Sequence, residues 1–404
     1  MLTPLPLPAV PASTTLPGEA RPCLGRLARR LLATFALALA SVTFLSGINA
    51  SAEPLPGRWT EAQARTWDMS TGWKVGCNYS PAYAINQLEM WQADTFDPAA
   101  VDRELAWAES LGFTSLRVFL HDLAWSQDPK GFLRRVDTFL DLAHRHHLGV
   151  MLVPFDAVWD PFPKAGPQRA PRPHVHNSGW VQSPGAEVLR DPARQDEMKA
   201  YLVSVMTRFR KDRRVHAWDL FNEPDNPNTS AYGTVELRDK KERALEFLAK
   251  VWVWAREVEA KQPLTSGVWI GNWPDPGQLT PMEKFQLENS DIISFHHYGD
   301  LPGLIKCVDN LRRYRRPILC TEYMARPAGS TFSPHLGWMR EHGVAAYNWG
   351  FVAGKTQTQY PWDSWTRTYT AEPPVWFHEI FRPDGSPYRA QEVNYIRDVT
   401  RAKR

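Results

Sequence analysis

The stretch Val215-His216-Ala217-Trp218-Asp219-Leu220-Phe221-Asn222-Glu223-Pro224 is a largely apolar run that ends in an amide, a carboxylate and a proline. A short apolar run with such an end is typical of a buried strand of a parallel sheet. A proline disfavours helical geometry in the residue before it, so we expect Glu223 to be extended at the strand tip. The stretch therefore predicts a strand over 215–222 that delivers Asn222 and Glu223 to one edge of a sheet.

Seven further runs of the same kind are found along the chain, and helical patterns of period 3.6 fill the gaps between them. Strand followed by helix, repeated eight times, predicts an α/β protein with a single (β/α)8 TIM barrel. No linker-like stretch divides 53–404, so we expect one domain there. The predicted strands are 73–79, 115–120, 149–155, 215–222, 264–271, 291–298, 317–322 and 344–351.

Long connections follow several of these strands, over 80–97, 156–192, 223–238, 272–280 and 352–387. In such a barrel they lie at the C-terminal face, where enzymes of this fold build their sites. They are rich in tryptophan, and flat aromatic faces suit the C–H faces of sugar rings. Plain packing of the loops onto the barrel is the alternative reading for many of these side chains.

The first 52 residues have the order of a secretory signal: Arg26 to Arg30, an apolar run from Leu31 to Leu45, and Ala50-Ser51-Ala52. We predict a signal peptide over 1–52, cleaved after Ala52, and a secreted or periplasmic domain over 53–404 with no membrane span. An uncleaved anchor and a twin-arginine signal at Arg29-Arg30 are alternatives.

The predicted leader also explains the net charge of +3. It carries four of the 47 basic residues and one of the 44 acidic residues, so the rest of the chain is neutral. A neutral body argues against a nucleic-acid partner, and 43% hydrophobic residues argue against disorder. Cys77, Cys307 and Cys320 follow the leader without metal-site spacing, and we expect all three to be unpaired.

A second glutamate, Glu322, ends the predicted strand 317–322, three strands round the barrel from Glu223. Two carboxyls across one barrel mouth provide what glycoside hydrolysis needs, a protonated acid for the leaving oxygen and an ionised carboxylate for the anomeric carbon. Either glutamate alone is weak support, because strand-end carboxylates often pair with an arginine. Together they predict a catalytic pair.

Asn222-Glu223-Pro224 and Thr321-Glu322-Tyr323 resemble the two catalytic motifs of the clan A glycoside hydrolases, most closely glycoside hydrolase family 5, the cellulase family. The resemblance extends from about Trp73 to Arg397. It implies a retaining β-glycosidase with Glu223 as acid/base and Glu322 as nucleophile. It also implies a β-linked oligo- or polysaccharide of the plant cell-wall type as substrate, and no metal or cofactor.

Other positions match the same family. Arg117 resembles the arginine under the nucleophile, His296 and Tyr298 resemble its His-x-Tyr pair, and Trp349 resembles the floor of the sugar subsite. Arg117 as a structural ion pair and Trp349 as plain packing are the alternatives. His297 is expected to be a core histidine.

The residues themselves support these roles. The charge of Arg117 would keep Glu322 ionised, and the Tyr298 hydroxyl would donate to the same carboxylate. Burial would keep Glu223 protonated until Glu322 is bonded to sugar. The Asn222 amide would donate to the sugar 2-hydroxyl.

The third strand departs from the family, because Val153-Pro154-Phe155-Asp156 stands where a histidine is usual. We expect Asp156, with Trp159 or with His174 or His176 of the following loop, to take over contacts to the substrate. Lys355 and Gln357, in the loop after the eighth strand, are further candidates for hydroxyl contacts.

Two other functions stay open. A catalytically inactive barrel that binds carbohydrate would need the same aromatic faces, and a lyase or isomerase acting on a phosphorylated sugar would need a phosphate-binding loop that the sequence lacks. The sugar, the linkage and endo or exo action are not identified. The long loops 156–192 and 352–387 favour a pocket, and hence exo or short-oligosaccharide action.

Overall fold

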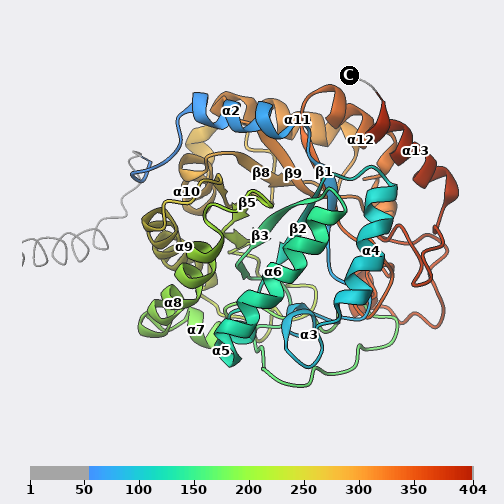
Figure 1. Ribbon diagram of the computed structural model, residues 1–404, viewed down its shortest axis with the longest axis horizontal. Helices are drawn as coiled ribbons and strands as arrows, with labels where there is room; N and C mark the ends of the chain where they lie inside the picture. The colour runs from blue at the N-terminus through green and yellow to red at the C-terminus, as the bar shows by residue number, and fades with distance from the viewer. Residues whose placement is uncertain (1–53, 403–404) are drawn as a thin grey trace, which may run out of the picture. The chain divides into compact units, whose positions relative to one another are not determined.

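The computed structural model describes residues 54–402, and eight parallel strands lie at its centre (Figure 1). Their order is β7-β5-β3-β2-β1-β10-β9-β8. The two ends of this order meet where Val268 pairs with Phe295 and the His296 N–H donates to the Val268 carbonyl at 3.0 Å. The sheet is therefore closed into the predicted (β/α)8 barrel. The strands are β1 (Val75–Asn78), β2 (Ser115–Phe119), β3 (Gly149–Val153), β5 (Val215–Asp219), β7 (Leu264–Thr265), β8 (Ile293–His296), β9 (Ile318–Tyr323) and β10 (Ala345–Asn348).

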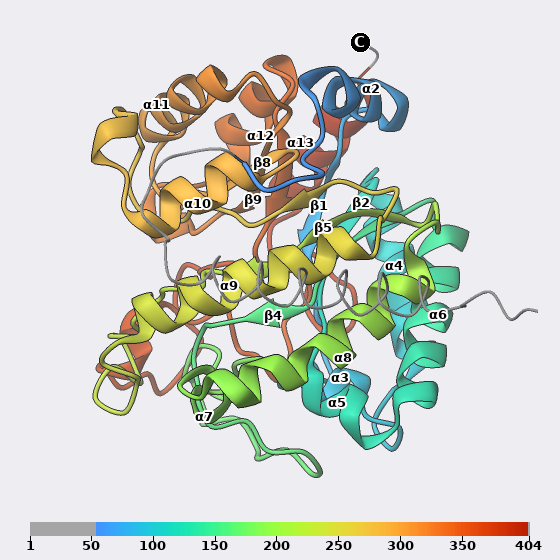
Figure 2. The same cartoon turned by 90° about the vertical axis from the view of Figure 1, so that its left-hand side faces the viewer.

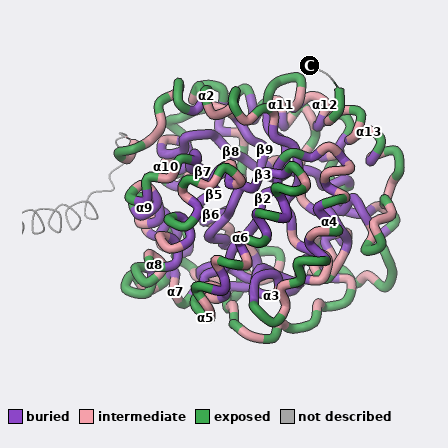
Figure 3. The backbone as a smooth tube through the Cα atoms, in the orientation of Figure 1, coloured by how far each residue is buried: buried purple, intermediate pink, exposed green. Residues whose placement is uncertain are grey.

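Helices surround the strands, with their outer faces exposed and the strands buried (Figure 3). Three of them begin with an aspartate followed by proline, at Asp97, Asp128 and Asp191, and each aspartate accepts a backbone N–H of the first turn. The helices between strands are α4 (Pro98–Ser110), α6 (Pro129–Arg145), α8 (Pro192–Phe209), α9 (Lys240–Glu257), α10 (Pro281–Asn289), α11 (Leu301–Leu311), α12 (Phe332–Glu341) and α13 (Ala390–Arg401). The connections hold α3 (Gln87–Trp91), α5 (Asp122–Gln127), α7 (Ala186–Leu189) and the 3-10 turns η1 (Pro276–Gln278), η2 (Arg312–Tyr314), η3 (Arg326–Ala328) and η4 (Trp362–Trp365).

The third and fourth barrel strands continue as a second small sheet. β4 (Phe155–Asp156) pairs in parallel with β6 (Phe221–Asn222), so the predicted strands 149–155 and 215–222 are each interrupted. Pro154 has no N–H to donate and stands at the first interruption. This extension carries Asp156 and Asn222 beyond the barrel rim. The fifth strand, β7, is much shorter than the predicted 264–271.

The N-terminal helix α2 (Glu61–Thr71) closes the end of the barrel opposite the long connections. Ala64 is buried against inward-facing side chains such as Met151 and Tyr347, and Trp59 and Trp67 pack around them. Figures 1 and 2 both place α2 at the end of the barrel away from the connection that follows β4. The C-terminal ends of the strands are therefore the open face of the barrel.

The predicted signal peptide over 1–52 lies outside the described residues. Within residues 54–402, no helix combines the length and the apolar character needed to cross a membrane. Cys77, Cys307 and Cys320 are buried and unpaired, as predicted.

Candidate active site

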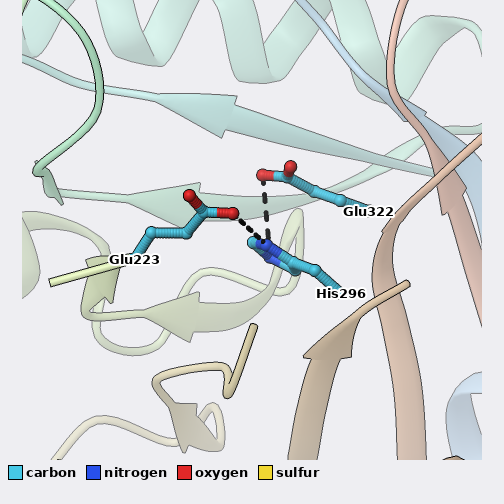
Figure 4. A group of neighbouring side chains, drawn as sticks. All are labelled: Glu223, His296 and Glu322. Carbon is cyan, nitrogen blue, oxygen red and sulfur yellow. Dashed lines mark hydrogen bonds and ion pairs between the residues drawn. The ribbon is translucent and has the colours of Figure 1, made fainter. Parts of the chain in front are cut away.

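Glu223 and Glu322 meet at the C-terminal face, with His296 between them (Figure 4). Glu223 follows β6, Glu322 lies in β9 and His296 ends β8. One carboxylate oxygen of each glutamate and one ring nitrogen of His296 all lie within 4.8 Å of one another. Glu223 is only 7% exposed and Glu322 only 4%. The two predicted catalytic carboxyls therefore share one buried space.

Both oxygens of Glu322 accept hydrogen bonds. Arg117 Nη1 donates to Oε1 at 2.7 Å, and the Tyr298 hydroxyl donates to Oε2 at 2.7 Å. Both predicted contacts are present. Burial nevertheless raises the pKa of Glu322 above its ordinary value, because His296, Arg117 and Tyr298 offset the loss of hydration only in part.

Arg117 is fully buried and connects four strands of the barrel. Its guanidinium donates to Asp219 at 3.0 Å, to Asn78 at 2.8 Å and to Asn222 at 2.6 Å, as well as to Glu322. Arg117 thus also forms a structural ion pair, the alternative role expected for it, and its partner is Asp219. The same network orients Asn78 and Asn222 around the nucleophile position.

The two oxygens of Glu223 have different partners. Oε1 lies 2.7 Å from His296 Nδ1, and Oε2 accepts from Asn226 Nδ2 at 2.6 Å. The Asn226 amide cannot be reversed, because its Oδ1 accepts the Asn228 N–H at 2.8 Å. Oε2 is therefore an acceptor in this contact, and a proton on Oε1 of a protonated Glu223 would point to His296.

The pKa shifts of Glu223 and His296 agree with a proton on Glu223 Oε1. Burial raises the pKa of Glu223 to about 7, and the Asn226 hydrogen bond lowers it only in part. Burial lowers the pKa of His296 to about 4, so the ring is neutral at pH 7. A neutral His296 that accepts at Nδ1 carries its hydrogen on Nε2, which faces Glu322 Oε1 at 3.6 Å.

The backbone of Glu223 differs from the prediction. Its φ is +42°, in the left-handed region, so the extended conformation expected before Pro224 is wrong. The chain turns tightly here, and the Asn226 N–H donates to the Glu223 carbonyl at 3.0 Å. Such a conformation costs about 1–3 kcal/mol in a residue with a side chain. The turn brings Asn226 back onto the carboxyl of Glu223.

Asp156 holds the side chain of Asn222 through a hydrogen bond. Its Oδ1 accepts from Asn222 Nδ2 at 2.9 Å, and its Oδ2 accepts from Trp180 at 2.6 Å and Gln87 at 3.1 Å. Burial raises the pKa of Asp156 to about 6. The side chain is buried among protein donors, so its present contacts position Asn222.

Aromatic side chains line the mouth around the pair. Trp349 is half-buried and packs edge-on against Phe119 and Trp180, with ring centroids 5.7 and 6.0 Å apart. Trp159 is stacked on Trp365 at 5.6 Å. Trp349 and Trp159 thus both belong to the aromatic cluster formed with Phe119 and Trp180.

Lys355 and Gln357 hold loops together instead of facing the site, so their expected role as hydroxyl contacts is not supported. The Lys355 ammonium pairs with Glu89. Gln357 accepts the His174 N–H at 2.7 Å and donates to the Arg172 carbonyl at 2.8 Å. His176 likewise contacts the Tyr360 carbonyl, and His297 contacts the main chain of Asp300, as a structural histidine does.

Glu223, His296 and Glu322 are also the metal-ligating side chains that converge within residues 54–402. The guanidinium of Arg117 lies against Glu322, and both oxygens of that carboxylate are already held by donors. A positive charge in this position repels a cation. The donor set fits acid–base and nucleophilic chemistry better than metal binding.

Sequence reasoning missed three residues of this network. Asn78 ends β1 and accepts from Arg117, Asp219 is the acidic residue in the apolar strand β5, and Asn226 holds Glu223. A polar residue at the end of β1 and an acid inside a buried strand were visible signals. The role of Asn226 depends on the turn at Glu223, which the sequence did not indicate.

Comparisons with known proteins find similar folds. No family model matches the chain, and no curated protein matches its sequence. GH5_18 from Streptomyces cattleya, solved with GlcNAc, is 14% identical, with a TM-score of 0.52, over 82% of this chain and 81% of that one. An exo-β-1,4-mannosidase from Opitutaceae bacterium strain TAV5 is 20% identical, with a TM-score of 0.53, over 82% of this chain and 59% of that one. An endo-1,4-β-D-mannanase from Thermotoga petrophila is 14% identical, with a TM-score of 0.50, over 81% and 99%. The chain therefore shares the (β/α)8 fold of these glycoside hydrolases.

Proposed function

We propose that the protein is a retaining β-glycosidase that cleaves β-linked oligo- or polysaccharides by double displacement. The separation of the two carboxyls carries the proposal, since an oxygen of Glu223 and an oxygen of Glu322 lie within 4.8 Å. Carboxyls about 5–5.5 Å apart are typical of retaining glycosidases, whereas inverting enzymes need about 6.5–9.5 Å to admit a water.

In the first step, Glu322 attacks the anomeric carbon while Glu223 transfers the proton of Oε1 to the glycosidic oxygen. The bond between that carbon and oxygen breaks, the leaving sugar departs with the proton, and a glycosyl ester forms on Glu322. Arg117, which touches Glu322 and not Glu223, favours the arrangement in which Glu322 is ionised and Glu223 holds the proton.

In the second step, Glu223 acts as a base. The ester on Glu322 has no charge, so the ionised form of Glu223 is no longer opposed by a neighbouring carboxylate. Glu223 takes a proton from water, the water oxygen attacks the anomeric carbon, and Glu322 leaves as a carboxylate. Two inversions retain the β configuration.

The aromatic mouth around Trp349 supports a sugar substrate, and the neutral composition of 53–404 suits an uncharged one. We therefore assign the protein to carbohydrate catabolism, with plant cell-wall type glycans as substrates. Residues 1–52 would direct its export. The structural likeness to mannosidases and mannanases supports the same class of reaction.

Turnover of a panel of aryl β-glycosides, including glucoside, mannoside, xyloside and galactoside, tests the proposal. We expect hydrolysis of at least one member, and a fall in kcat of about 10⁴-fold or more in Glu322→Gln, which keeps the shape but removes the nucleophile. Full turnover in Glu322→Gln would disprove the assignment. Binding of oligosaccharides without any turnover would favour the inactive carbohydrate-binding barrel.

A further inference from the structure

The barrel order determines where the two parts of the substrate lie, if the proposed function holds. Glu223 protonates the leaving oxygen, so the leaving group lies on the side of β5 and β6. In the order of strands, β10 stands opposite β5, four positions away in either direction. The sugar that is transferred to Glu322 therefore extends toward Trp349, which follows β10, and toward β1.

Three loops meet on that side and are bonded to one another. They are 79–97 after β1, 157–185 after β4 and 349–389 after β10. Between the second and third, Asn177 N–H donates to Thr356 O at 2.7 Å, His176 N–H to Ser364 Oγ at 2.9 Å and Trp365 Nε1 to His176 O at 2.8 Å.

The first loop is joined to both of the others. Asn86 Nδ2 donates to the Gly179 carbonyl at 2.8 Å, Gln92 Nε2 donates to the Gly166 carbonyl at 3.0 Å, and the Lys355 N–H donates to the Ala82 carbonyl at 3.0 Å. His176, Asn177 and Trp180 are at most 3% exposed. These three loops form a continuous, packed barrier, which we call the loop wall.

Little space is left between Trp349 and the loop wall. A cavity of about 20 Å³ lies beside Trp349, lined by Asn78 of β1, Phe119 of β2 and residues of the loop wall such as Ser80, Trp180 and Glu379. This volume holds about one water molecule. This cavity is much smaller than a sugar ring, so a longer chain on this side would have to displace the bonded loops of the loop wall.

On the opposite side, the connection after β7 is more exposed. Trp269, half-buried, follows β7 and donates to Asp225 at 2.8 Å, just after Glu223 in the chain. Its neighbour Ile270 is 59% exposed. The loop wall does reach the neighbouring connection 223–238, where Tyr232 packs on Trp365 with ring centroids 5.4 Å apart. The path left to a leaving group therefore runs past Trp269 and Ile270, after β7.

We propose that the loop wall restricts the enzyme to the non-reducing end of its substrate, from which it releases one sugar residue per turnover. The inference rests on the proposed function and adds exo action to it. The substrate class is a short β-linked oligosaccharide or a chain end, with the terminal ring at Trp349 and the remainder leaving past Trp269.

The product profile on reducing-end-labelled hexaoses tests this directly. The full-length protein is incubated with fluorescently labelled β-1,4-linked gluco-, manno- and xylohexaose, and early products are separated by length. Exo action predicts that labelled pentaose appears first, followed by labelled tetraose. An early mixture of short labelled products would show internal cleavage and overturn the inference while leaving the proposed function intact. Absence of turnover on every aryl glycoside and hexaose would overturn the proposed function, and the inference with it.

Loosening the loop wall provides a second readout. Trp365→Ala removes the stacking on Trp159 and the bond to His176, and Gln357→Ala is a milder change that removes the bonds to His174 and Arg172. In either variant, the ratio of internal to terminal cleavage rises severalfold. Gln278→Ala, exposed in the connection after β7, is the matched control and keeps the wild-type ratio. An unchanged ratio in both folded wall variants would contradict a limiting role of the loop wall.

Discussion

At the scale of single residues, Glu223 shows how neighbours assign a proton. Asn226 can only donate to Oε2, and its orientation is set by the backbone of Asn228. The proton is left on Oε1, beside a histidine whose pKa is lowered by burial. Glu322 instead faces the fixed charge of Arg117. Two glutamates of identical chemistry thus have different surroundings, which suit the two roles proposed for them.

The acid role proposed for Glu223 predicts how activity falls on the alkaline side of the pH–activity profile, its alkaline limb. The protonated form is required, so activity is present below the pKa of Glu223 and is lost as the pH rises through about 7. Other charged or titratable groups also affect the electrostatic potential at this carboxyl: Arg117, Asp225, Lys240, His296 and Glu322.

Asn226→Ala removes a donor that stabilises the ionised form, so the limb moves to higher pH by about one unit. The measurement is kcat/KM against pH on a glycoside with a poor leaving group. Asn310→Ala, the same side-chain change on α11, serves as control. A limb that does not move in Asn226→Ala would argue against this contact.

Glu223→Ala tests the acid/base role separately from the nucleophile. We expect kcat to fall by about 10²–10⁴-fold on glycosides with poor leaving groups and by less on activated aryl glycosides, which need no proton. Azide fills the space of the lost carboxyl and attacks the glycosyl ester, restoring turnover and giving a β-glycosyl azide. If neither the turnover nor the azide product is observed, Glu223 is not the acid/base.

At the scale of elements, α2 is a plug for the N-terminal end of the barrel. Trp67 packs against the cluster around Ala64, donates to the His216 carbonyl at 3.1 Å and lies under Lys74, whose ammonium is 4.0 Å from the ring centroid. The contact with His216 is distant in sequence, and the side chains around Trp67 cover the N-terminal layer of the barrel core.

Trp67→Ala should therefore reduce stability and leave catalysis unchanged. We expect a loss of about 2–3 kcal/mol in the free energy of unfolding, below the 3–5 kcal/mol of a fully buried tryptophan because Trp67 is half-exposed. Urea unfolding measures the loss, and kcat per folded molecule is the internal control. A large fall in kcat with unchanged stability would show that α2 acts on the site.

The sequence was sufficient to predict the elements where local pattern determines them. All eight strands follow from apolar runs along the chain, and the runs that end at Glu223 and Glu322 bring these two carboxyls together. The split at Pro154, the short β7 and the left-handed Glu223 depend on contacts between distant segments, such as the pairing of β4 with β6. The loop wall depends on side chains like Gln357, which bonds a loop more than 180 positions away, and no local pattern marks such a residue.

At the scale of the whole molecule, the two ends of the barrel are covered to different extents and by different means. At the N-terminal end, α2 adds apolar side chains to the barrel core. At the C-terminal face, the hydrogen-bonded loop wall covers one part and leaves Glu223 and Glu322 at its edge. The proposed active site thus combines strand residues, such as Glu322 in β9, with the loops of the C-terminal face, as is usual in this fold.

The central claim is that Glu223 and Glu322 catalyse a double displacement, and the configuration of the first product tests it most directly. Proton NMR of a hydrolysing aryl β-glycoside, recorded before mutarotation, resolves the two anomers of the released sugar. The account predicts that the β anomer appears first and that the α anomer grows in later. An α anomer that appears first would show inversion and contradict the roles assigned to both glutamates.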